Sequence, residues 1–75
     1  MELQNTDILA SIREALFRFR NAEKKVAESI LKDPEAVIGK SITSLAEEAG
    51  VSEPTIIRFC RRLGLNGYMD LKMVL

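Results

Sequence analysis

The sequence predicts an all-α domain, a small bundle of five or six helices that contains a helix-turn-helix. Apolar residues recur at spacings of three and four through most of the chain, which is the period of a buried helix face. Serine, proline and glycine stand at intervals where successive helices would begin and end. The period-two alternation of a strand never lasts longer than a few residues. These three observations leave no segment that favours a sheet.

Length and composition predict a single domain over residues 1–75. A chain of 75 residues buries only about 60% of the surface that its unfolded form exposes, so partner subunits can add to its stability. No apolar run approaches the roughly 18 residues of a membrane span. Residues 1–5 lack the basic and apolar regions of a signal peptide. We therefore expect a cytoplasmic protein.

The residue types available for chemistry are few. The chain has one cysteine, Cys60, and no histidine, so a disulfide within the chain and a multi-cysteine zinc site are both excluded. No pair of nucleophile and base can be named. We expect no enzyme activity, no catalytic residue, no cofactor and no metal. Cys60 falls on the apolar face of its predicted helix, which predicts an inert packed thiol.

The first half of the chain predicts three helices. Thr6 is expected to cap the first, whose apolar stripe consists of Ile8, Ile12, Leu16 and Phe19. Asn21 is expected to cap the second, whose inward rows contain Ala22, Val26 and Ile30, and Ala27 and Leu31. Asp33 and Pro34 close this helix and start a short third one, because proline disfavours helical geometry in the residue before it. Gly39 ends the third helix.

The stretch from Ile42 to Arg62 has the spacing of a helix-turn-helix. Ser41 is expected to cap a fourth helix from about Ile42 to Ala49, and Ser52 a fifth helix that ends at about Leu63. Gly50 lies where a left-handed backbone is needed.

Small and apolar side chains in this stretch fit the contact between its two helices. Ala46 allows their close approach, Val51 plugs the turn, and Ile56 and Phe59 return to the fourth helix. Pro54 is tolerated in the first turn, where an amide is not needed.

The last segment predicts a stop at Gly64, a turn at Asn66 and Gly67, and a sixth helix. That helix stops on the apolar residues Met73, Val74 and Leu75. An apolar, uncapped end of this kind leads us to expect that the chain is the N-terminal fragment of a longer regulator.

The outward face of the fifth helix supplies candidate DNA contacts, because the major groove admits a helix and its N-terminal residues approach the base edges. Glu53 is predicted to accept from cytosine, Ile57 to touch a thymine methyl group, and Arg58 to read guanine in a bidentate manner. The predicted base-proximal and phosphate-proximal positions complete the set: Ser52, Pro54, Thr55, Arg61, Arg62, Ser41 and Lys40.

The charge balance keeps a second interpretation open. Eleven basic and eleven acidic residues give a net charge of zero, which argues against a nucleic-acid binder. The segment 54–68 nevertheless has three arginines and no acidic residue. The alternative is a helical protein-interaction module, which the acidic pair Glu47 and Glu48 favours. A salt-dependent response to random DNA would distinguish the two.

Residues 41–72, SITSLAEEAGVSEPTIIRFCRRLGLNGYMDLK, resemble the N-terminal domain of the RpiR-type bacterial sugar-phosphate regulators. The upstream run AEKKVAESILKDPE is similar to the second helix of that family. The resemblance covers about residues 12–75. The elements SEPT (52–55) and RFCR (58–61) look closest to the HexR branch, repressors of hexose catabolism.

This resemblance implies functions beyond the residue-level reading. It implies that the domain binds double-stranded operator DNA through Ser52 to Thr55, Ile57, Arg58 and Arg61. It also implies a following sugar isomerase (SIS) domain, absent from these 75 residues, that binds a phosphosugar effector and helps assembly. The apolar surface of the first and last helices leads us to expect a homodimer, with half-sites roughly 34 Å apart or a multiple of that distance.

Overall fold

The computed structural model describes residues 4–75, with side chains from residue 8 onward. Six helices occupy this range, and it contains no strand: α1 (Gln4–Ala15), α2 (Asn21–Lys32), α3 (Pro34–Ile38), α4 (Ile42–Ala49), α5 (Glu53–Arg62) and α6 (Tyr68–Val74). The all-α prediction is therefore confirmed. No helix in the described range is long and apolar enough to cross a membrane.

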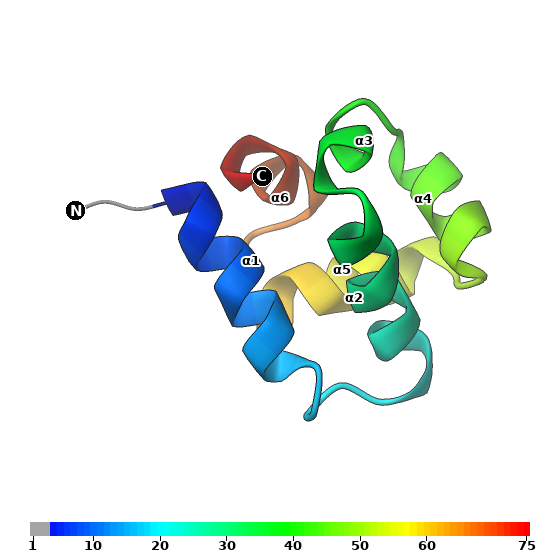
Figure 1. Ribbon diagram of the computed structural model, residues 1–75. Helices are drawn as coiled ribbons and strands as arrows, with labels where there is room; N and C mark the ends of the chain where they lie inside the picture. The colour runs from blue at the N-terminus through cyan, green and yellow to red at the C-terminus, as the bar shows by residue number, and fades with distance from the viewer. Residues whose placement is uncertain (1–3) are drawn as a thin grey trace.

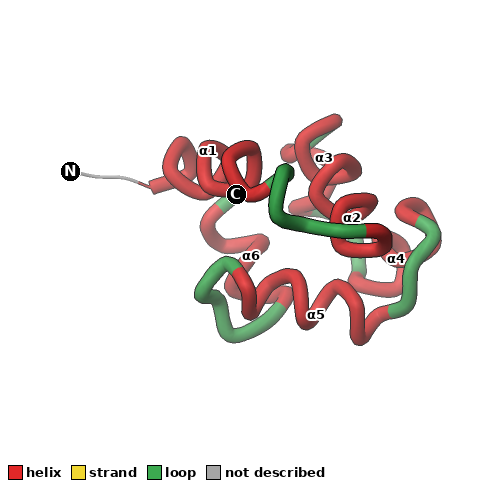
Figure 2. Tube along the Cα trace, turned by 90° about the horizontal axis from the view of Figure 1, so that it is seen from below, coloured by secondary structure: helices red, strands yellow, loops and turns green. Residues whose placement is uncertain are grey.

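Helix α2 is the centre of the arrangement, because it packs against α1, α3, α4 and α5 (Figure 1). Helix α6 closes the other side through contacts with α1, α3 and α5. Figure 2 shows α5 along one edge of the domain, entered through the turn that follows α4. The fold therefore buries one face of α5 and leaves the opposite face at the molecular surface.

The core contains side chains from all the helices, which explains why the apolar stripes repeat along the whole chain. Its largest fully buried members are Phe59, Ile12, Ile30, Leu45, Ile56, Leu71, Val26, Val37 and Cys60. The rings of Phe19 and Phe59 have centroids 4.9 Å apart and planes tilted by 43°. This geometry is favourable for aromatic pairs, and it joins the loop after α1 to α5.

Tyr68 links the last helix to the segment before α4. Its hydroxyl contacts two backbone carbonyl oxygens, that of Lys40 at 2.9 Å and that of Val37 at 3.3 Å. The Tyr68 side chain is otherwise buried, and Lys72 Nζ lies 5.4 Å from the centre of its ring. The buried hydroxyl thus has its partners, as a buried polar group requires.

Two predicted caps, Ser41 and Ser52, are confirmed by their hydrogen bonds, and Asp33 forms a third cap that was not predicted. Ser41 Oγ accepts from the Ser44 amide at 3.0 Å, and Ser52 Oγ accepts from the Thr55 amide at 3.3 Å. Asp33 caps α3 by accepting from the Ala36 amide at 3.3 Å. Each bond satisfies an amide that has no partner within its own helix.

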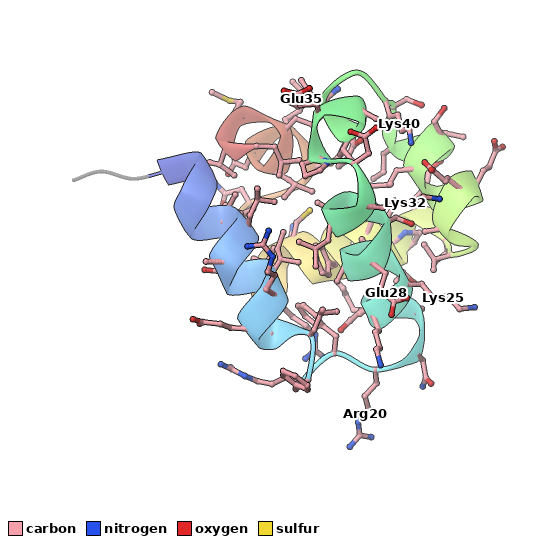
Figure 3. All side chains as sticks on the ribbon, viewed as in Figure 1. Arg20, Lys25, Glu28, Lys32, Glu35 and Lys40 are labelled. Atoms are coloured by element: carbon pink, nitrogen blue, oxygen red, sulfur yellow. The ribbon has the colours of Figure 1, made fainter. Side chains whose placement is uncertain are left out.

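Two predicted helix starts were wrong. In the part of the chain that the structure describes, α1 begins at Gln4, so Thr6 lies inside the helix. The N-cap position of α2 is Arg20, which makes no side-chain cap, and Figure 3 shows its side chain extending away from the domain. Asn21 is instead the first residue of α2, with φ of 48°. Asparagine tolerates this left-handed conformation better than most residues, which explains its place at the bend.

The stripe of the first helix is also shorter than predicted. Helix α1 ends at Ala15, and the amides of Arg18 and Phe19 donate to the Ala15 carbonyl at 2.8 and 3.0 Å. The chain turns here, so Phe19 reaches the core from a loop and Phe17 remains exposed.

Candidate nucleic-acid interface

The turn between α4 and α5 has the geometry that the sequence predicts for a helix-turn-helix. Gly50 is left-handed, with φ of 75°. Its amide and that of Val51 both donate to the Ala46 carbonyl at 2.9 Å, which closes the end of α4. Ser52 is extended and caps α5 two residues after the glycine. A residue with a Cβ at position 50 would be strained, so this short turn depends on glycine.

The two faces of α5 separate as predicted at most positions. Ile56, Phe59 and Cys60 are buried against the other helices. Ile57 is half-buried, and the positions at the surface are Ser52, Glu53, Pro54, Arg58, Arg61 and Arg62. The predicted outward set is thus brought together on one helix and its cap, with one exception.

Thr55 is the exception, since only 5% of it is exposed. Its hydroxyl lies 2.9 Å from Ser52 Oγ and accepts from Arg58 Nη2 at 3.4 Å. Thr55 stands four residues before Phe59 and therefore shares the inner face of α5. That spacing is visible in the sequence, although the cap position led us to place all four residues 52–55 near the bases. The structure gives Thr55 contacts within the protein instead.

Two of the predicted arginines meet a carboxylate that sequence reasoning missed. Glu23 lies in the first turn of α2. Its Oε1 is 3.0 Å from Arg62 Nε, and its Oε2 is 3.6 Å from Arg58 Nε. The Glu23 side chain is 12% exposed, whereas those of Arg58 and Arg62 are 62% and 61% exposed. Local patterns carry no signal for this cluster, because it depends on how α2 packs against α5.

Two further polar contacts involve predicted contact residues. Thr43 Oγ1 on α4 donates to Glu53 Oε2 on α5 at 2.7 Å. Lys40, between α3 and α4 in Figure 3, forms an ion pair with Glu48. Sequence reasoning included Lys40 and Glu53 but missed Thr43, whose position on the outer face of α4 was its only signal. Glu53 and Lys40 therefore already have partners within the domain.

An open apolar hollow lies at the N-terminal end of α5. It has a volume of about 430 Å³ and is lined by Ile42, Glu53, Pro54, Ile57 and Arg58. Ile42, from the first turn of α4, was not among the predicted contacts. The hollow places apolar side chains beside a guanidinium and a carboxylate. A ligand with both an apolar group and a polar edge could therefore contact both kinds of side chain here.

Cys60 has no place on this surface, because it is fully buried. Burial raises the pKa of its thiol to about 11 from an ordinary value of 9.0, and the negative charge of Asp70 adds to the effect. A protonated, enclosed thiol is a poor nucleophile. Packing is the role that its position supports.

Several known proteins are similar to the chain. It is 46% identical over 69 residues to the HTH-type transcriptional regulator HexR of Pseudomonas aeruginosa, covering 92% of this chain and 24% of that protein. It is 44% identical over 70 residues to an uncharacterized HTH-type transcriptional regulator of Thermotoga maritima, covering 92% and 25%. A match to the bifunctional protein glk of Burkholderia mallei has 40% identity and covers 91% of this chain and 11% of that protein. The chain thus spans about a quarter or less of the length of these relatives.

A solved structure is also similar to the chain. The crystal structure of the N-terminal domain of ybbH from Bacillus subtilis has a TM-score of 0.84 and 35% sequence identity, covering 88% of this chain and 80% of that one. The family model described as the helix-turn-helix domain of the rpiR family matches residues 6–75. With the turn, the caps and the buried face of α5 as described, the chain belongs to the rpiR family of helix-turn-helix domains.

Proposed function

We propose that this chain is the DNA-reading domain of a transcriptional regulator, and that α5 enters the major groove of operator DNA. The observation that carries the proposal is the outer face of α5, the second helix of a helix-turn-helix. This face presents three arginines, and one of them, Arg58, lines an apolar hollow at the N-terminal end of the helix. Recognition helices of this class approach base edges with their N-terminal residues. The hollow and Arg58 lie on that part of α5.

The residues of this face divide into base-proximal and backbone-proximal roles. Arg58 would donate two bonds to guanine, which is the commonest specific contact in the major groove. Ile57, with Ile42 across the hollow, would take a thymine methyl group. Glu53 would accept from a cytosine amino group through the oxygen that Thr43 leaves free.

Phosphate contacts would flank these positions. They would come from Arg61 and Arg62 near the end of α5, and from Ser41 and Lys40 at the start of α4. The amides at the starts of α4 and α5, where Ser41 and Ser52 form the caps, can bind phosphate as well. Thr55 would act indirectly, through its contact with Arg58.

Two copies of the domain would be needed for tight binding, since a chain of zero net charge has little non-specific attraction to DNA. The apolar surface of α6, where Met69 and Met73 are exposed one turn apart, supports a homodimer. Half-sites would then be roughly 34 Å apart, or a multiple of that distance.

The wider role would be regulation of sugar or sugar-phosphate metabolism in the cytoplasm, with the protein acting as a repressor. This part rests on the resemblance to the RpiR and HexR regulators. A phosphosugar effector would bind a separate SIS domain and not residues 1–75. Within residues 1–75, α5 would contact the DNA, whereas the resemblance implies that the effector binds another domain.

Selection of bound sites from a random pool of duplex DNA tests the proposal. The expected result is enrichment of a short, inverted-repeat sequence whose binding weakens steeply as salt rises. Absence of enrichment, together with no binding of random DNA at low salt, would contradict DNA reading. That result would favour the protein-interaction module, which the zero net charge and the exposed Glu47 support.

A further inference from the structure

We propose that Glu23 determines DNA specificity as a positioning residue, by holding the Arg58 and Arg62 side chains and reducing their attraction to random DNA. The inference rests on the proposed function, because it concerns how the α5 face distinguishes an operator from other sequences. Glu23 lies on α2, outside the helix-turn-helix and outside the predicted contact set.

The geometry gives one carboxylate two arginine partners from successive turns of α5. Oε1 faces Arg62 Nε at 3.0 Å and Oε2 faces Arg58 Nε at 3.6 Å. The carboxylate is mostly enclosed, while more than half of each arginine side chain is exposed. The inner part of each guanidinium is therefore anchored, and the rest of the side chain remains accessible to a ligand.

Arg58 is restrained from a second direction as well. Its Nη2 donates to Thr55 Oγ1 at 3.4 Å, while its Nε faces Glu23. A guanidinium has five N–H donors in a fixed plane, so these two contacts orient the plane and leave donors for the two acceptors of a guanine edge. An ordered side chain loses less conformational entropy on binding. Glu23 and Thr55 thus prepare Arg58 for one base.

The same carboxylate acts against non-specific binding. Random DNA is bound almost entirely through phosphate charge, and a negative charge shared by two arginines reduces the local positive potential. The Glu23 charge lowers the affinity for the operator less, because operator binding also uses base contacts that depend on the orientation of Arg58. Glu23 therefore widens the ratio between specific and non-specific affinity instead of raising affinity as such.

A purely structural role has to be separated from this one, since an acid in the first turn of α2 also stabilises the positive end of that helix. The variant Glu23→Gln removes the charge while preserving the side-chain volume. Glu28→Gln is the matched control: Glu28 is on the same helix and exposed, and Figure 3 shows it on the outer face between Lys25 and Lys32. The two variants have the same net charge, so a general electrostatic effect changes both equally.

The experiment measures affinity for the selected operator and for a random duplex of equal length over a range of salt. Glu23→Gln is expected to bind random DNA roughly fivefold more tightly than wild type, with no gain on the operator, so that the affinity ratio falls about fivefold or more. Glu28→Gln should keep the wild-type ratio. Equal ratios for wild type and Glu23→Gln would overturn the inference and leave the proposed function intact.

A second readout reports the positioning directly. In the free protein, the Nε–H groups of Arg58 and Arg62 should show restricted motion by ¹⁵N relaxation, whereas Arg61 should be mobile. Glu23→Gln should make Arg58 and Arg62 as mobile as Arg61, and Glu28→Gln should not. Mobile Arg58 and Arg62 in the wild type would overturn the inference. If the wild type bound no DNA at any salt concentration, the proposed function and this inference would fail together.

Discussion

Thr43 and Glu53 join the two helices of the helix-turn-helix through a hydrogen bond of 2.7 Å between Thr43 Oγ1 and Glu53 Oε2. The bond holds the carboxylate of Glu53, the first residue of α5, against the outer face of α4. It uses one oxygen and leaves the other for a base. Glu53 is therefore held in place by a residue that would not itself need to touch DNA.

Thr43→Val should broaden the base preference at the position read by Glu53, because the carboxylate loses its restraint. Stability should fall by no more than about 1 kcal/mol, since the bond is exposed. Competition with operators substituted at each position measures the preference. Ser44→Ala, which removes a neighbouring exposed hydroxyl, is the control. An unchanged preference in Thr43→Val would show that the bond does not position Glu53.

Arg58→Ala should weaken operator binding by about 1–3 kcal/mol and relax the preference at one base pair. Arg61→Ala should instead weaken operator and random DNA alike and reduce the salt slope by about one. Titrations of both DNA types at several salt concentrations distinguish the two patterns. Similar patterns for the two variants would contradict the division of α5 into base and phosphate contacts.

The apolar hollow predicts sensitivity to a single methyl group. Replacement of one operator thymine by deoxyuridine should weaken binding by about 0.8 kcal/mol, the value of one buried methyl-sized group. Ile57→Ala should remove the difference between the two bases, which a double-mutant cycle would show as a coupling energy. If the free-energy effects of Ile57→Ala and of the deoxyuridine replacement were additive at every thymine, Ile57 would contact no thymine methyl group.

Cys60 predicts a loss of stability at alkaline pH. The unfolded thiol ionises near 9.0, whereas the folded thiol has a pKa of about 11, so folding favours the protonated form. Its contribution is complete below pH 9.0 and is lost as the pH rises toward 11, by about 2–3 kcal/mol in all. Urea denaturation from about pH 8 to about pH 11 measures this decline.

Cys60→Ala is the control for this decline, because burial also raises the pKa of Tyr68 and gives a loss of the same sign. The variant should be less stable at every pH owing to the small cavity, but its stability should fall less steeply. Parallel curves for the two proteins would contradict the assignment to Cys60.

The sequence predicts the helices well because their signals are local. Ser41, Gly50 and Ser52 act within three or four residues, and the structure places each of them as expected. Asn21 shows the limit: asparagine suits both a cap and a left-handed bend, and the packing of Phe19 into the core accompanies the second outcome. Local chemistry alone does not choose between the two.

The candidate surface was predicted where one helix defines it and missed where two helices meet. The period of α5 separates Arg58 and Arg61 from Ile56 and Phe59 without further information. Glu23 lies 35 positions before Arg58 in the chain, and only the packing of α2 on α5 brings them together. The roles of these residues toward DNA remain predictions.

The Tyr68 hydroxyl connects α6 to the backbone that leads into the helix-turn-helix. It contacts the carbonyls of Val37 and Lys40, directly before the cap of α4, and α6 also packs on α5. A rotation of α6 that withdrew this hydroxyl would remove a donor from the Lys40 carbonyl, whereas the Val37 carbonyl would keep the Lys40 amide as its donor at 3.0 Å. Leaving that carbonyl of Lys40 without its hydroxyl donor would cost free energy, so the orientation of α6 is linked to the segment that leads into the helix-turn-helix.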